Sequence, residues 1–476
     1  MKKGYLALCL LLVLGLAGCK GAKAPAADTT ITQEQSKRLE TDRTAAKQEA
    51  ATQAQTETET QTAPETGAET ETQEAETKAA ADAEVILGDE QFDEYIPLLE
   101  GKRIALFSNH TGIVGDDTGA ESRHILDALI EHGINVTAIF SPEHGFRGTA
   151  DAGTNVADSV DEKTGVPILS LYHEGSHYPS RESMNTFDIL VADMQDVGLR
   201  YYTYYISLYY LMDACAAAGR EMMILDRPNP NGFYVDGPLL REEYKSGVGR
   251  LPIPVVYGMT WGELAGMING EGWLETGKDA LKLTVIPCRN YTHSMKTSLI
   301  RNPSPNLRSM RAVYLYASLC FFENTYVSVG RGTEMPFEVY GSPYLKGENY
   351  DFSFVPESID GAANPPFQGE TCYGRDLRDI PLEEIREAGI NLDYLIGAYH
   401  DFEEALKEAG EDPAAHDFFG YQKSGGKYWI DLLSGSDDLR KQITDGKSAA
   451  QIKESWQADI DSFKAQRRPY LLYPEQ

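Results

Sequence analysis

The 476-residue sequence predicts an α/β protein with a doubly wound, mostly parallel sheet, followed by a second, smaller α+β domain. Two observations support this fold class. Short β-branched runs alternate with helical patterns through the first half of the folded region, as in successive βαβ units. After Pro303-Ser304-Pro305-Asn306 the pattern changes to apolar helical segments and to stretches rich in Gly, Pro and aromatic residues. A domain boundary is therefore expected near residue 300.

Six strands are expected in the parallel sheet, with helices between them. The strands are predicted at 103–107, 135–140, 166–171, 188–192, 221–225 and 281–286, and the helices at 122–132, 203–218 and 261–269. In the second domain, helices are expected at 311–322, 391–406, 437–445 and 449–467, with loops and short strands at 327–344. We therefore expect a signal peptide with lipobox (1–19), a tether (20–84), a Rossmann-like first domain (85–300) and a C-terminal α+β domain (301–476), with the cleft between the two domains as the natural ligand site.

Residues 1–19 have the pattern of a bacterial lipoprotein signal peptide. Lys2 and Lys3 precede an apolar stretch that is too short to span a membrane, and Leu16-Ala17-Gly18-Cys19 places small residues directly before a cysteine. Cleavage would leave Cys19 as an acylated N-terminus, and two acyl chains anchor a protein durably. We therefore expect an extracytoplasmic protein, lipid-anchored to the outer face of the bacterial cell membrane. An ordinary secretory signal is the alternative.

The segment 20–84 is dominated by Thr, Glu, Ala and Gln and contains no aromatic residue. It cannot bury enough apolar surface to offset the entropy of ordering, so a disordered tether is expected. Its root-mean-square reach is on the order of 45 Å. Such a tether would hold the folded body off the membrane, within reach of the cell wall.

The formal net charge is −30, and most of it belongs to the folded body, because the tether has seven basic and fourteen acidic residues. An acidic body argues against nucleic-acid binding, which needs clustered Lys and Arg. The four cysteines of the body show no Cys-x-x-Cys spacing and are expected to be buried free thiols, although an exported compartment also allows one or two disulfide bridges that spacing cannot assign. They are Cys215, Cys288, Cys320 and Cys372.

Polar sequences follow four of the predicted strands. They occupy residues 108–112, 141–148, 193–202 and 225–232. In an open α/β sheet, ligands bind beyond the carboxyl ends of the strands, and parallel strands bring these ends to one edge. Convergence of four polar clusters at this edge predicts a ligand site there.

Glu143 and His144 form the most prominent candidate reacting centre. Glu143 follows Pro142, and a carboxyl held beside the apolar end of a sheet should have the raised pKa that a general acid requires. Taken alone, a glutamate in this position could equally be a helix-cap partner or a solvated loop charge. His144 is ambiguous between a positioning residue, a metal ligand and a core histidine.

Three other chemistries have weaker support. The segment His173-Glu174-Gly175-Ser176-His177 matches His-Glu-x-x-His, but a zinc site needs both histidines on one helical face, and this segment has loop composition. The first strand is not followed by Gly-x-Gly-x-x-Gly and the chain has no P-loop, which argues against a nucleotide-dependent reaction. The chain also has no Gly-x-Ser-x-Gly elbow, which argues against a serine esterase. No metal and no cofactor is therefore expected.

Several motifs resemble the exo-β-N-acetylmuramidase family, glycoside hydrolase family 171, formerly a domain of unknown function. They are Ser-Pro-Glu-His-Gly-Phe-Arg-Gly (141–148), Asp-Met-Gln-Asp-Val-Gly-Leu-Arg-Tyr-Tyr-Thr-Tyr (193–204), Leu-Asp-Arg-Pro-Asn-Pro (225–230), Pro-Ser-Pro-Asn-Leu (303–307) and Gly-Arg-Gly-Thr-Glu-Met-Pro-Phe (330–337). The resemblance runs in consistent order from about residue 88 to the C-terminus. It implies a Rossmann-like N-terminal domain, a smaller C-terminal domain, and removal of terminal N-acetylmuramic acid from the non-reducing end of peptidoglycan fragments.

Within this resemblance, Glu143 matches the family's proposed catalytic glutamate and His144 its neighbour. Glycoside cleavage usually needs a second carboxylate, for which Asp196 and Glu334 are candidates, unless the substrate's own N-acetyl group attacks. One departure follows residue 172, where a Gly-Glu-x-Arg-Arg-Pro-like sequence is expected and His-Glu-Gly-Ser-His-Tyr-Pro is found. Arginine contacts from that loop are therefore in doubt.

The substrate itself suggests further roles for the polar residues. The lactyl carboxylate of muramic acid needs a cation, and arginine favours bidentate pairing. Candidates for this role are Arg147, Arg200, Arg227 and Arg331. Asn109, Asp193, Gln195 and Asn229 are candidates for holding hydroxyls or the acetamide, and Tyr201 and Tyr202 for stacking on a sugar ring.

Two other functional classes remain open alongside the glycosidase. One is a non-catalytic lipoprotein that binds muropeptides. The other is a metal-dependent hydrolase that uses His110, His144 and His173 or His177. The expected partners are peptidoglycan-derived sugars or muropeptides and, through Cys19 alone, the membrane; the oligomeric state stays open.

Overall fold

The computed structural model describes residues 84–115, 122–142, 146, 159–171, 177–345, 347, 349–421 and 423–476. All described residues belong to one compact unit, Ala83–Gln476. The lipid site at Cys19 and, except for its last residue, the tether predicted at 20–84 lie outside the described residues. Within the described residues, no helix is both long enough and apolar enough to cross a membrane.

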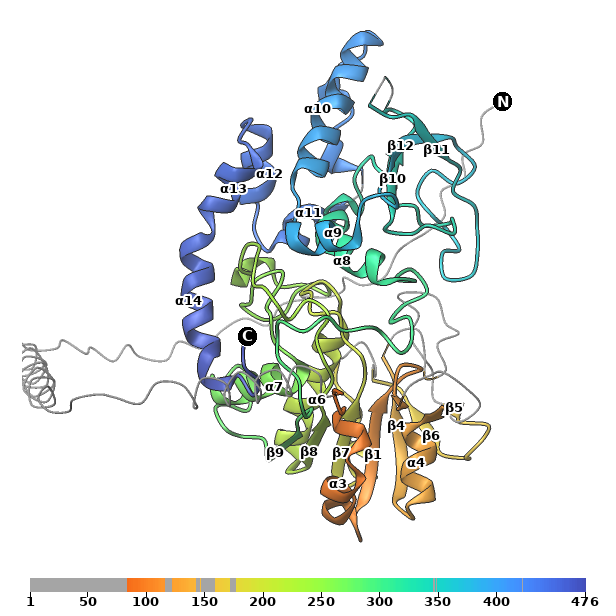
Figure 1. Cartoon of the computed structure of the whole chain (residues 1–476), viewed down its shortest axis with the longest axis vertical. Helices are drawn as coiled ribbons and strands as arrows, with labels where there is room; N and C mark the ends of the chain where they lie inside the picture. The colour runs from red at the N-terminus through yellow and green to blue at the C-terminus, as the bar shows by residue number, and fades with distance from the viewer. Residues whose placement is uncertain are drawn as a thin grey trace, which may run out of the picture. The chain divides into compact units, whose positions relative to one another are not determined.

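The second unit contains a seven-stranded sheet in the order β5-β6-β4-β1-β7-β8-β9 (Figure 1). Six strands are parallel and correspond to the six predicted ones, and β5 adds an antiparallel edge. Chain order runs outward from β1 through β4 to β6 and then returns to β7 on the other side of β1. The topological switch point of this doubly wound sheet is therefore the junction of β1 and β7. The strands are β1 (Arg103–Ser108), β4 (Asn135–Phe140), β5 (Ser159–Val160), β6 (Pro167–Leu169), β7 (Ile189–Asp193), β8 (Glu221–Leu225) and β9 (Leu283–Ile286).

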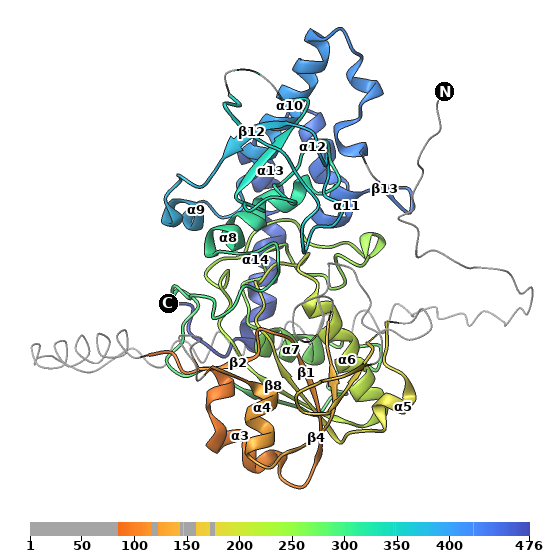
Figure 2. The same ribbon diagram turned by 90° about the vertical axis from the view of Figure 1, so that its right-hand side faces the viewer.

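Helices cover both faces of the sheet (Figure 2). Alternate residues of β1 point to opposite faces: Ile104 and Leu106 pack in the cluster with α3 and α4, whereas Ala105 and Phe107 pack in the cluster with α6 and α7. Burial on both faces explains why the central strands are continuous apolar runs. The helices are α3 (Phe92–Leu99), α4 (Ile125–Glu131), α5 (Arg181–Met184), α6 (Tyr204–Ala218) and α7 (Trp261–Gly270).

The C-terminal half is α+β, as predicted. Its small sheet has the order β10-β12-β11 and is antiparallel. The strands of this sheet are β10 (Val339–Ser342), β11 (Phe352–Phe354) and β12 (Cys372–Asp376). A separate two-stranded antiparallel sheet is formed by β13 (Lys423–Ser424) and β14 (Lys427–Tyr428). The helices are α8 (Met310–Leu319), α9 (Leu382–Ala388), α10 (Asp393–Glu408), α11 (Trp429–Ser434), α12 (Asp438–Thr444), α13 (Ala449–Ser455) and α14 (Gln457–Arg467).

Two predicted helices have different bounds in the structure. The helix expected at 122–132 begins only at Ile125, because β2 (Ile113–Val114) and β3 (Arg123–His124) pair as a short hairpin before it. The helix expected at 449–467 is interrupted at Trp456, whose φ is −107° and ψ is 2°. The Trp456 indole N–H donates to Asp236 Oδ1 at 3.0 Å, which fixes this break against the first half.

The four body cysteines are buried and free, as the sequence predicted. Burial raises the pKa of every one of these thiols, which keeps them in the protonated, unreactive form.

Candidate active site

The carboxyl ends of β7 and β8 meet at a buried ion-pair cluster formed by Asp89, Asp193 and Arg227. Asp193 ends β7 and Arg227 lies two residues beyond β8, so the parallel register brings both to one edge. Arg227 Nε donates to Asp193 Oδ1 at 2.6 Å, and its Nη2 donates to Asp89 Oδ2 at 2.7 Å. All three residues are at most 4% exposed. Charges this deeply buried require pairing, so the three residues act as one unit.

The surroundings of Asp89 raise its pKa strongly. Burial raises the pKa of Asp89 to about 8, although the charge of Arg227 opposes the rise. One guanidinium faces two buried carboxyls, and a proton on Asp89 lowers the negative charge that the cluster holds in the interior. Asp89 lies in the 3-10 turn η1 (Gly88–Glu90), ahead of the first strand. No local pattern marks it, and sequence reasoning missed it.

Hydrogen bonds tie the ends of β1, β7 and β8 together. Asn109 Oδ1 accepts from the Thr111 N–H at 2.9 Å and from its Oγ1 at 2.7 Å. Thr111 Oγ1 in turn accepts from the Gln195 backbone N–H at 2.9 Å. Gln195 Nε2 donates to the carbonyls of Asp196 at 2.8 Å and Pro228 at 2.9 Å. Three of the four predicted polar strand ends therefore converge at the switch point.

The fourth polar strand end contains the predicted reacting centre and follows β4. Ser141 follows β4 directly, and β4 pairs in parallel with β1, so Ser141 lies at the same edge of the sheet. Glu143, His144 and Arg147 lie outside the described residues. Their assignment as catalytic and binding residues stays a prediction.

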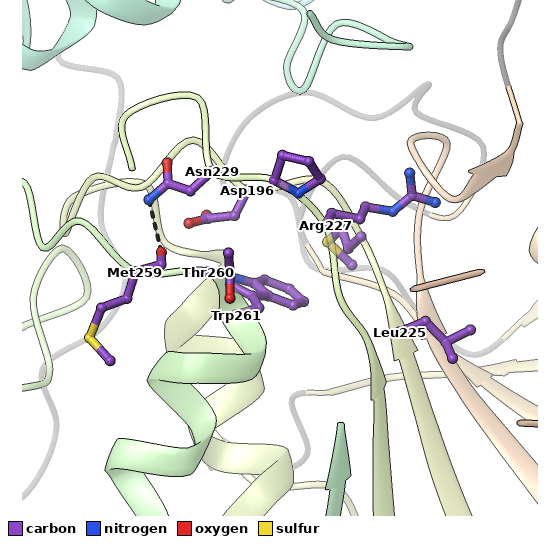
Figure 3. A pocket seen from close by; sticks show the side chains of 9 residues that line it. Asp196, Leu225, Arg227, Asn229, Met259, Thr260 and Trp261 are labelled. Carbon is purple, nitrogen blue, oxygen red and sulfur yellow. Dashed lines mark hydrogen bonds between the residues drawn. The ribbon is translucent and has the colours of Figure 1, made fainter. Parts of the chain in front are cut away.

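A small pocket lies between the ends of β7 and β8 and the start of α7 (Figure 3). Asn229 Nδ2 donates to the Met259 carbonyl at 2.8 Å and holds one wall of the pocket. The cavity volume is about 10 Å³, which is the space of about one water molecule. Its lining includes Met194, Asp196, Arg227, Asn229, Thr260 and Trp261.

Asp196 is the carboxylate of this pocket. Its Oδ2 accepts from the Tyr257 hydroxyl and from the Gly198 N–H at 2.9 Å, and Oδ1 is buried without a hydrogen-bond partner in the described structure. Burial raises the pKa of Asp196 to about 6, while these bonds and the nearby Trp261 indole N–H favour the ionised form. Gly198 has a φ of 72°, and a Cβ there would collide with Asn229. The turn thus requires glycine and presents a carboxyl that titrates near neutral pH.

A second acidic network holds the start of α7. Thr260 caps the helix and donates from Oγ1 to Asp226 Oδ2 at 2.6 Å, and Asp226 Oδ1 accepts from the Gly262 N–H at 2.9 Å. Glu263 Oε2 accepts from the Thr260 N–H at 2.9 Å. Burial raises the pKa of Asp226 to about 6. Sequence reasoning did not single out these residues, although Thr-x-x-Glu is the capping-box pattern that could have revealed them.

Arg200 lies in the interior and not at the pocket. It is 0% exposed, and burial lowers the pKa of its guanidinium to about 10. Nη1 donates to the carbonyls of Pro238 at 2.7 Å and Ile253 at 2.5 Å, and Nη2 donates to the Leu433 carbonyl at 2.9 Å. These bonds join the two halves of the chain. They give Arg200 a structural role and leave no support for its assignment to the lactyl carboxylate.

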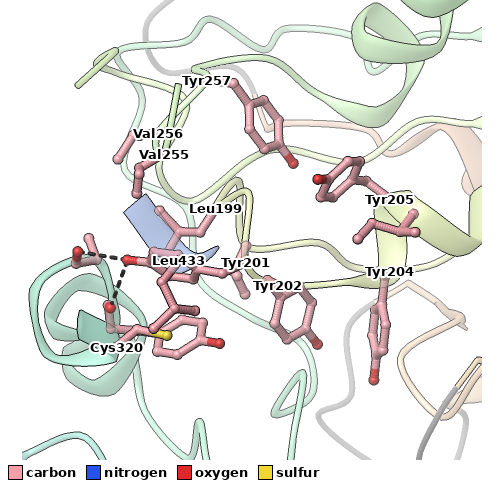
Figure 4. Packing of buried hydrophobic residues seen from close by; sticks show 14 of the residues in the cluster. Leu199, Tyr201, Tyr202, Tyr204, Tyr205, Val255, Val256, Tyr257, Cys320 and Leu433 are labelled. Atoms are coloured by element: carbon pink, nitrogen blue, oxygen red, sulfur yellow. Dashed lines mark hydrogen bonds between the residues drawn. The ribbon is translucent and has the colours of Figure 1, made fainter. Parts of the chain in front are cut away.

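Tyr201 and Tyr202 are also buried, at 3% and 7% exposure (Figure 4). The Tyr201 hydroxyl donates to the Ala317 carbonyl at 2.7 Å, and the Tyr202 hydroxyl donates to the Pro303 carbonyl at 2.7 Å. Tyr201 therefore holds α8, and Tyr202 the segment at the domain boundary, against the first half. Their buried rings do not support the predicted stacking on a sugar.

Arg331 and Glu334 do not line the pocket. Arg331 Nε donates to Glu323 Oε1 at 2.7 Å, and its guanidinium lies over the Phe337 ring. Glu334 forms an ion pair with Arg308 at 2.6 Å, and its side chain is 84% exposed. An exposed, ion-paired carboxylate lacks the surroundings that tune a catalytic acid or base.

Two histidines of the metal hypothesis, His110 and His177, belong to the described residues. His110 Nε2 forms a hydrogen bond with the Asn302 carbonyl at 2.9 Å, and His177 stacks on Tyr210 with ring centroids 5.1 Å apart. The other two histidines of that hypothesis lie outside the described residues. Among the residues that the structure describes, no group of three or more His, Cys, Asp or Glu side chains could hold a metal ion.

Comparison with known proteins identifies the family. The model of the N-terminal part of the exo-β-N-acetylmuramidase NamZ matches residues 104–311, and that of its C-terminal part matches residues 314–473. The peptidoglycan β-N-acetylmuramidase NamZ of Bacillus subtilis (strain 168) is 34% identical over 400 residues, which cover 81% of this chain and 90% of that protein.

Two solved structures of DUF1343 family proteins from Bacteroides fragilis NCTC 9343 are similar to this chain. One has 52% sequence identity and a TM-score of 0.72, and it covers 83% of this chain and 100% of that chain. The other has 26% identity and a TM-score of 0.66, and it covers 82% of this chain and 99% of that chain. The resemblance in the motifs and the expected fold class are both confirmed: the chain belongs to the exo-β-N-acetylmuramidase NamZ family.

Proposed function

We propose that this protein is an exo-acting β-N-acetylmuramidase. It hydrolyses terminal, non-reducing N-acetylmuramic acid from peptidoglycan fragments during cell-wall turnover and recycling. The observation that supports this most directly is the convergence of polar groups at the switch point of β1 and β7, in a chain of this family. That edge is where open α/β sheets bind their ligands.

In the proposed reaction, Glu143 donates a proton to the leaving glycosidic oxygen. Asp196 is the better of the two candidates for the second carboxylate. It is 6% exposed, it lines the pocket, and burial raises its pKa to about 6, whereas Glu334 is exposed and paired with Arg308. A carboxylate in this role stabilises the oxocarbenium-like transition state or activates water. Attack by the substrate's N-acetyl group is the alternative to a second carboxylate.

Arg147 and Arg227 remain candidates for recognition of the lactyl carboxylate. Arg200 is committed to backbone carbonyls and Arg331 to Glu323. Arg227 pairs with two aspartates, but it lines the pocket and its Nη1 has no hydrogen-bond partner among the described residues. Asn109 and Asn229 remain candidates for contacts with hydroxyls or the acetamide, because both lie at the carboxyl edge.

The protein is further proposed to be a lipoprotein, cleaved before Cys19 and anchored to the outer face of the cell membrane through the tether. The support is the sequence of the first 19 residues, in which two lysines, an apolar stretch and small residues precede Cys19 in the order of a lipoprotein signal peptide. Metabolic labelling with a radioactive fatty acid is expected to mark the wild type and not Cys19→Ser. Equal labelling of both would refute the lipid site.

The enzymatic function is tested by incubating the purified full chain with a chromogenic β-N-acetylmuramide. Release of the chromophore, unaffected by EDTA, is expected. Saturable binding of N-acetylmuramic acid without release would support a muropeptide-binding lipoprotein instead. Loss of release with EDTA and its return with zinc would support the metal-dependent hydrolase.

A further inference from the structure

The end of the chain returns from the C-terminal half to the first half and approaches the start of α7, whose residues Thr260 and Trp261 form one wall of the pocket. The last helix, α14, is followed by the 3-10 turn η6 (Arg468–Tyr470), which contacts α7. Figure 1 shows the C-terminus beside α7. Residues 472–474, which we name the C-terminal strap, follow η6 after one intervening residue, Leu471. The strap lies more than 200 residues along the chain from the pocket wall that it approaches.

Two backbone N–H groups of the strap donate hydrogen bonds to the buried carboxylate of Glu263. Glu263 Oε1 accepts from the N–H of Leu472 at 2.8 Å and from that of Tyr473 at 3.3 Å. The same oxygen accepts from His293 Nε2 at 3.0 Å, while His293 N–H donates to the Pro474 carbonyl at 2.9 Å. Glu263 is 0% exposed, so its charge depends on these donors. The strap thereby satisfies the capping-box glutamate of α7.

The Tyr473 hydroxyl connects the strap to the pocket wall. It accepts from the Cys288 N–H at 3.0 Å and donates to Asp226 Oδ2 at 2.5 Å. That same Asp226 oxygen accepts from Thr260 Oγ1 at 2.6 Å, and Thr260 and Trp261 line the pocket beside Asp196. Two successive hydrogen bonds therefore join Tyr473 to a residue of the wall.

A second route runs through Tyr291. Its ring packs edge-on against Tyr473 with centroids 4.9 Å apart. The Tyr291 hydroxyl accepts from the Asn229 N–H at 3.3 Å, and Asn229 lines the pocket. Tyr473 thus supports both sides of the pocket, one through Asp226 and one through Tyr291.

The strap is attached by both apolar and polar contacts. The Tyr473 ring is 7% exposed and packs in a cluster with Cys288 and Tyr291, whereas Leu472 is 49% exposed. The strap's N–H groups and its tyrosine hydroxyl donate to carboxylates. Simple anchoring of a chain terminus could be achieved by apolar packing alone. The placement of these donors on the groups that hold Thr260 indicates a role in shaping the pocket.

We propose that Tyr473 is a positioning residue for the hydrolytic reaction, which holds the Thr260–Trp261 wall against Asp196 by its hydrogen bond to Asp226. This inference rests on the proposed function of the pocket as part of the active site. Tyr473 does not touch the substrate. Removal of its hydroxyl is expected to displace the wall and to impair the chemical step more than substrate binding, since small displacements of reacting groups lower rates strongly.

The test compares Tyr473→Phe with Tyr470→Phe in the full chain. Tyr470 is a matched control in the same segment, because its hydroxyl donates at 2.7 Å to the exposed Glu271 and makes no bond to the pocket wall. Hydrogen–deuterium exchange of the peptide spanning 259–264 is measured first, since it needs no activity. Next, kcat and KM on a chromogenic β-N-acetylmuramide are measured well below both melting temperatures.

For Tyr473→Phe we expect faster exchange of the 259–264 peptide and a roughly tenfold lower kcat with KM within about twofold. Tyr470→Phe should match the wild type in both measurements. Unchanged exchange, or an effect on kcat no larger than that of Tyr470→Phe, overturns the inference. A wild type without activity refutes the proposed function instead, and unchanged exchange would then still refute the support of the wall by Tyr473.

Discussion

Asp196 and Glu334 belong to family motifs in different regions of the chain, and they differ in almost every physical respect. Asp196 follows β7, is 6% exposed and receives hydrogen bonds from Tyr257 and Gly198. Glu334 lies in a loop of the C-terminal half, with a side chain that is 84% exposed and paired with Arg308. Burial raises the pKa of the first to about 6. The comparison teaches that a sequence motif can only identify candidate catalytic carboxylates. Their burial and hydrogen-bond partners in the fold decide whether they can perform the chemistry.

The largest expected effect concerns the buried cluster beside Asp196. Arg227→Leu removes the cation that two buried aspartates share, and it is expected to lower the free energy of unfolding by about 3–5 kcal/mol. Urea denaturation measures this change. Arg289→Leu is the control, because its ion pair with Glu94 is more than half exposed and is worth at most about 1 kcal/mol. Equal losses of unfolding free energy in Arg227→Leu and Arg289→Leu would show that burial does not make the ion pairs of Arg227 more important for stability than that of Arg289.

The next prediction concerns pH. The folded protein keeps the proton of Asp196 up to about pH 6, whereas the unfolded chain loses it near 3.8. Between these values the unfolded state binds fewer protons, so the stabilising contribution present below pH 3.8 is lost as the pH rises. Relative to Asp196→Asn, the wild type should lose up to about 3 kcal/mol of unfolding free energy between pH 4 and pH 7. Urea denaturation at several pH values measures this loss, and parallel profiles would contradict it.

The same position is expected to affect catalysis. Asp196→Asn should lower kcat by about 100-fold, the lower range for loss of an acid–base group, because the pocket would lose its titrating carboxyl. Steady-state kinetics on the chromogenic substrate measures this change. Activity within twofold of the wild type would remove Asp196 from the mechanism and favour attack by the substrate's N-acetyl group.

The smallest effect is expected at Glu334. Glu334→Gln weakens an exposed ion pair and should change the free energy of unfolding by less than about 1 kcal/mol. Activity should stay within about twofold of the wild type. A large loss of activity with normal stability would reverse the ranking of the two carboxylates.

The sheet was predictable because its signal is local. Each central strand is a continuous apolar run, as in β7, where all five residues are buried. The end of α6 was predictable for a similar reason, since Gly219 adopts a φ of 63° as its cap. By contrast, α3 contains Pro97, which obscures a helical pattern, and the predicted helix over 449–467 is broken by a contact between Trp456 and the distant Asp236.

The site was predictable only as far as strand ends reveal it. Parallel topology alone brings Asn109, Gln195 and Arg227 to one edge. The partners that tune them come from distant parts of the chain: Asp89 is 138 residues from Arg227, and Tyr473 is 247 residues from Asp226. No local pattern encodes such pairs. The buried position of Arg200 could not be inferred from its motif either, because its guanidinium donates to the carbonyl of the distant Leu433.

The most direct test of the account uses a disaccharide that carries N-acetylmuramic acid at its non-reducing end, with products identified by mass spectrometry. The wild type should release free N-acetylmuramic acid, Glu334→Gln should do so at a similar rate, and Glu143→Gln should be slower by about 1000-fold, as expected for loss of a general acid. No release by the wild type, or undiminished release by Glu143→Gln, would contradict the account.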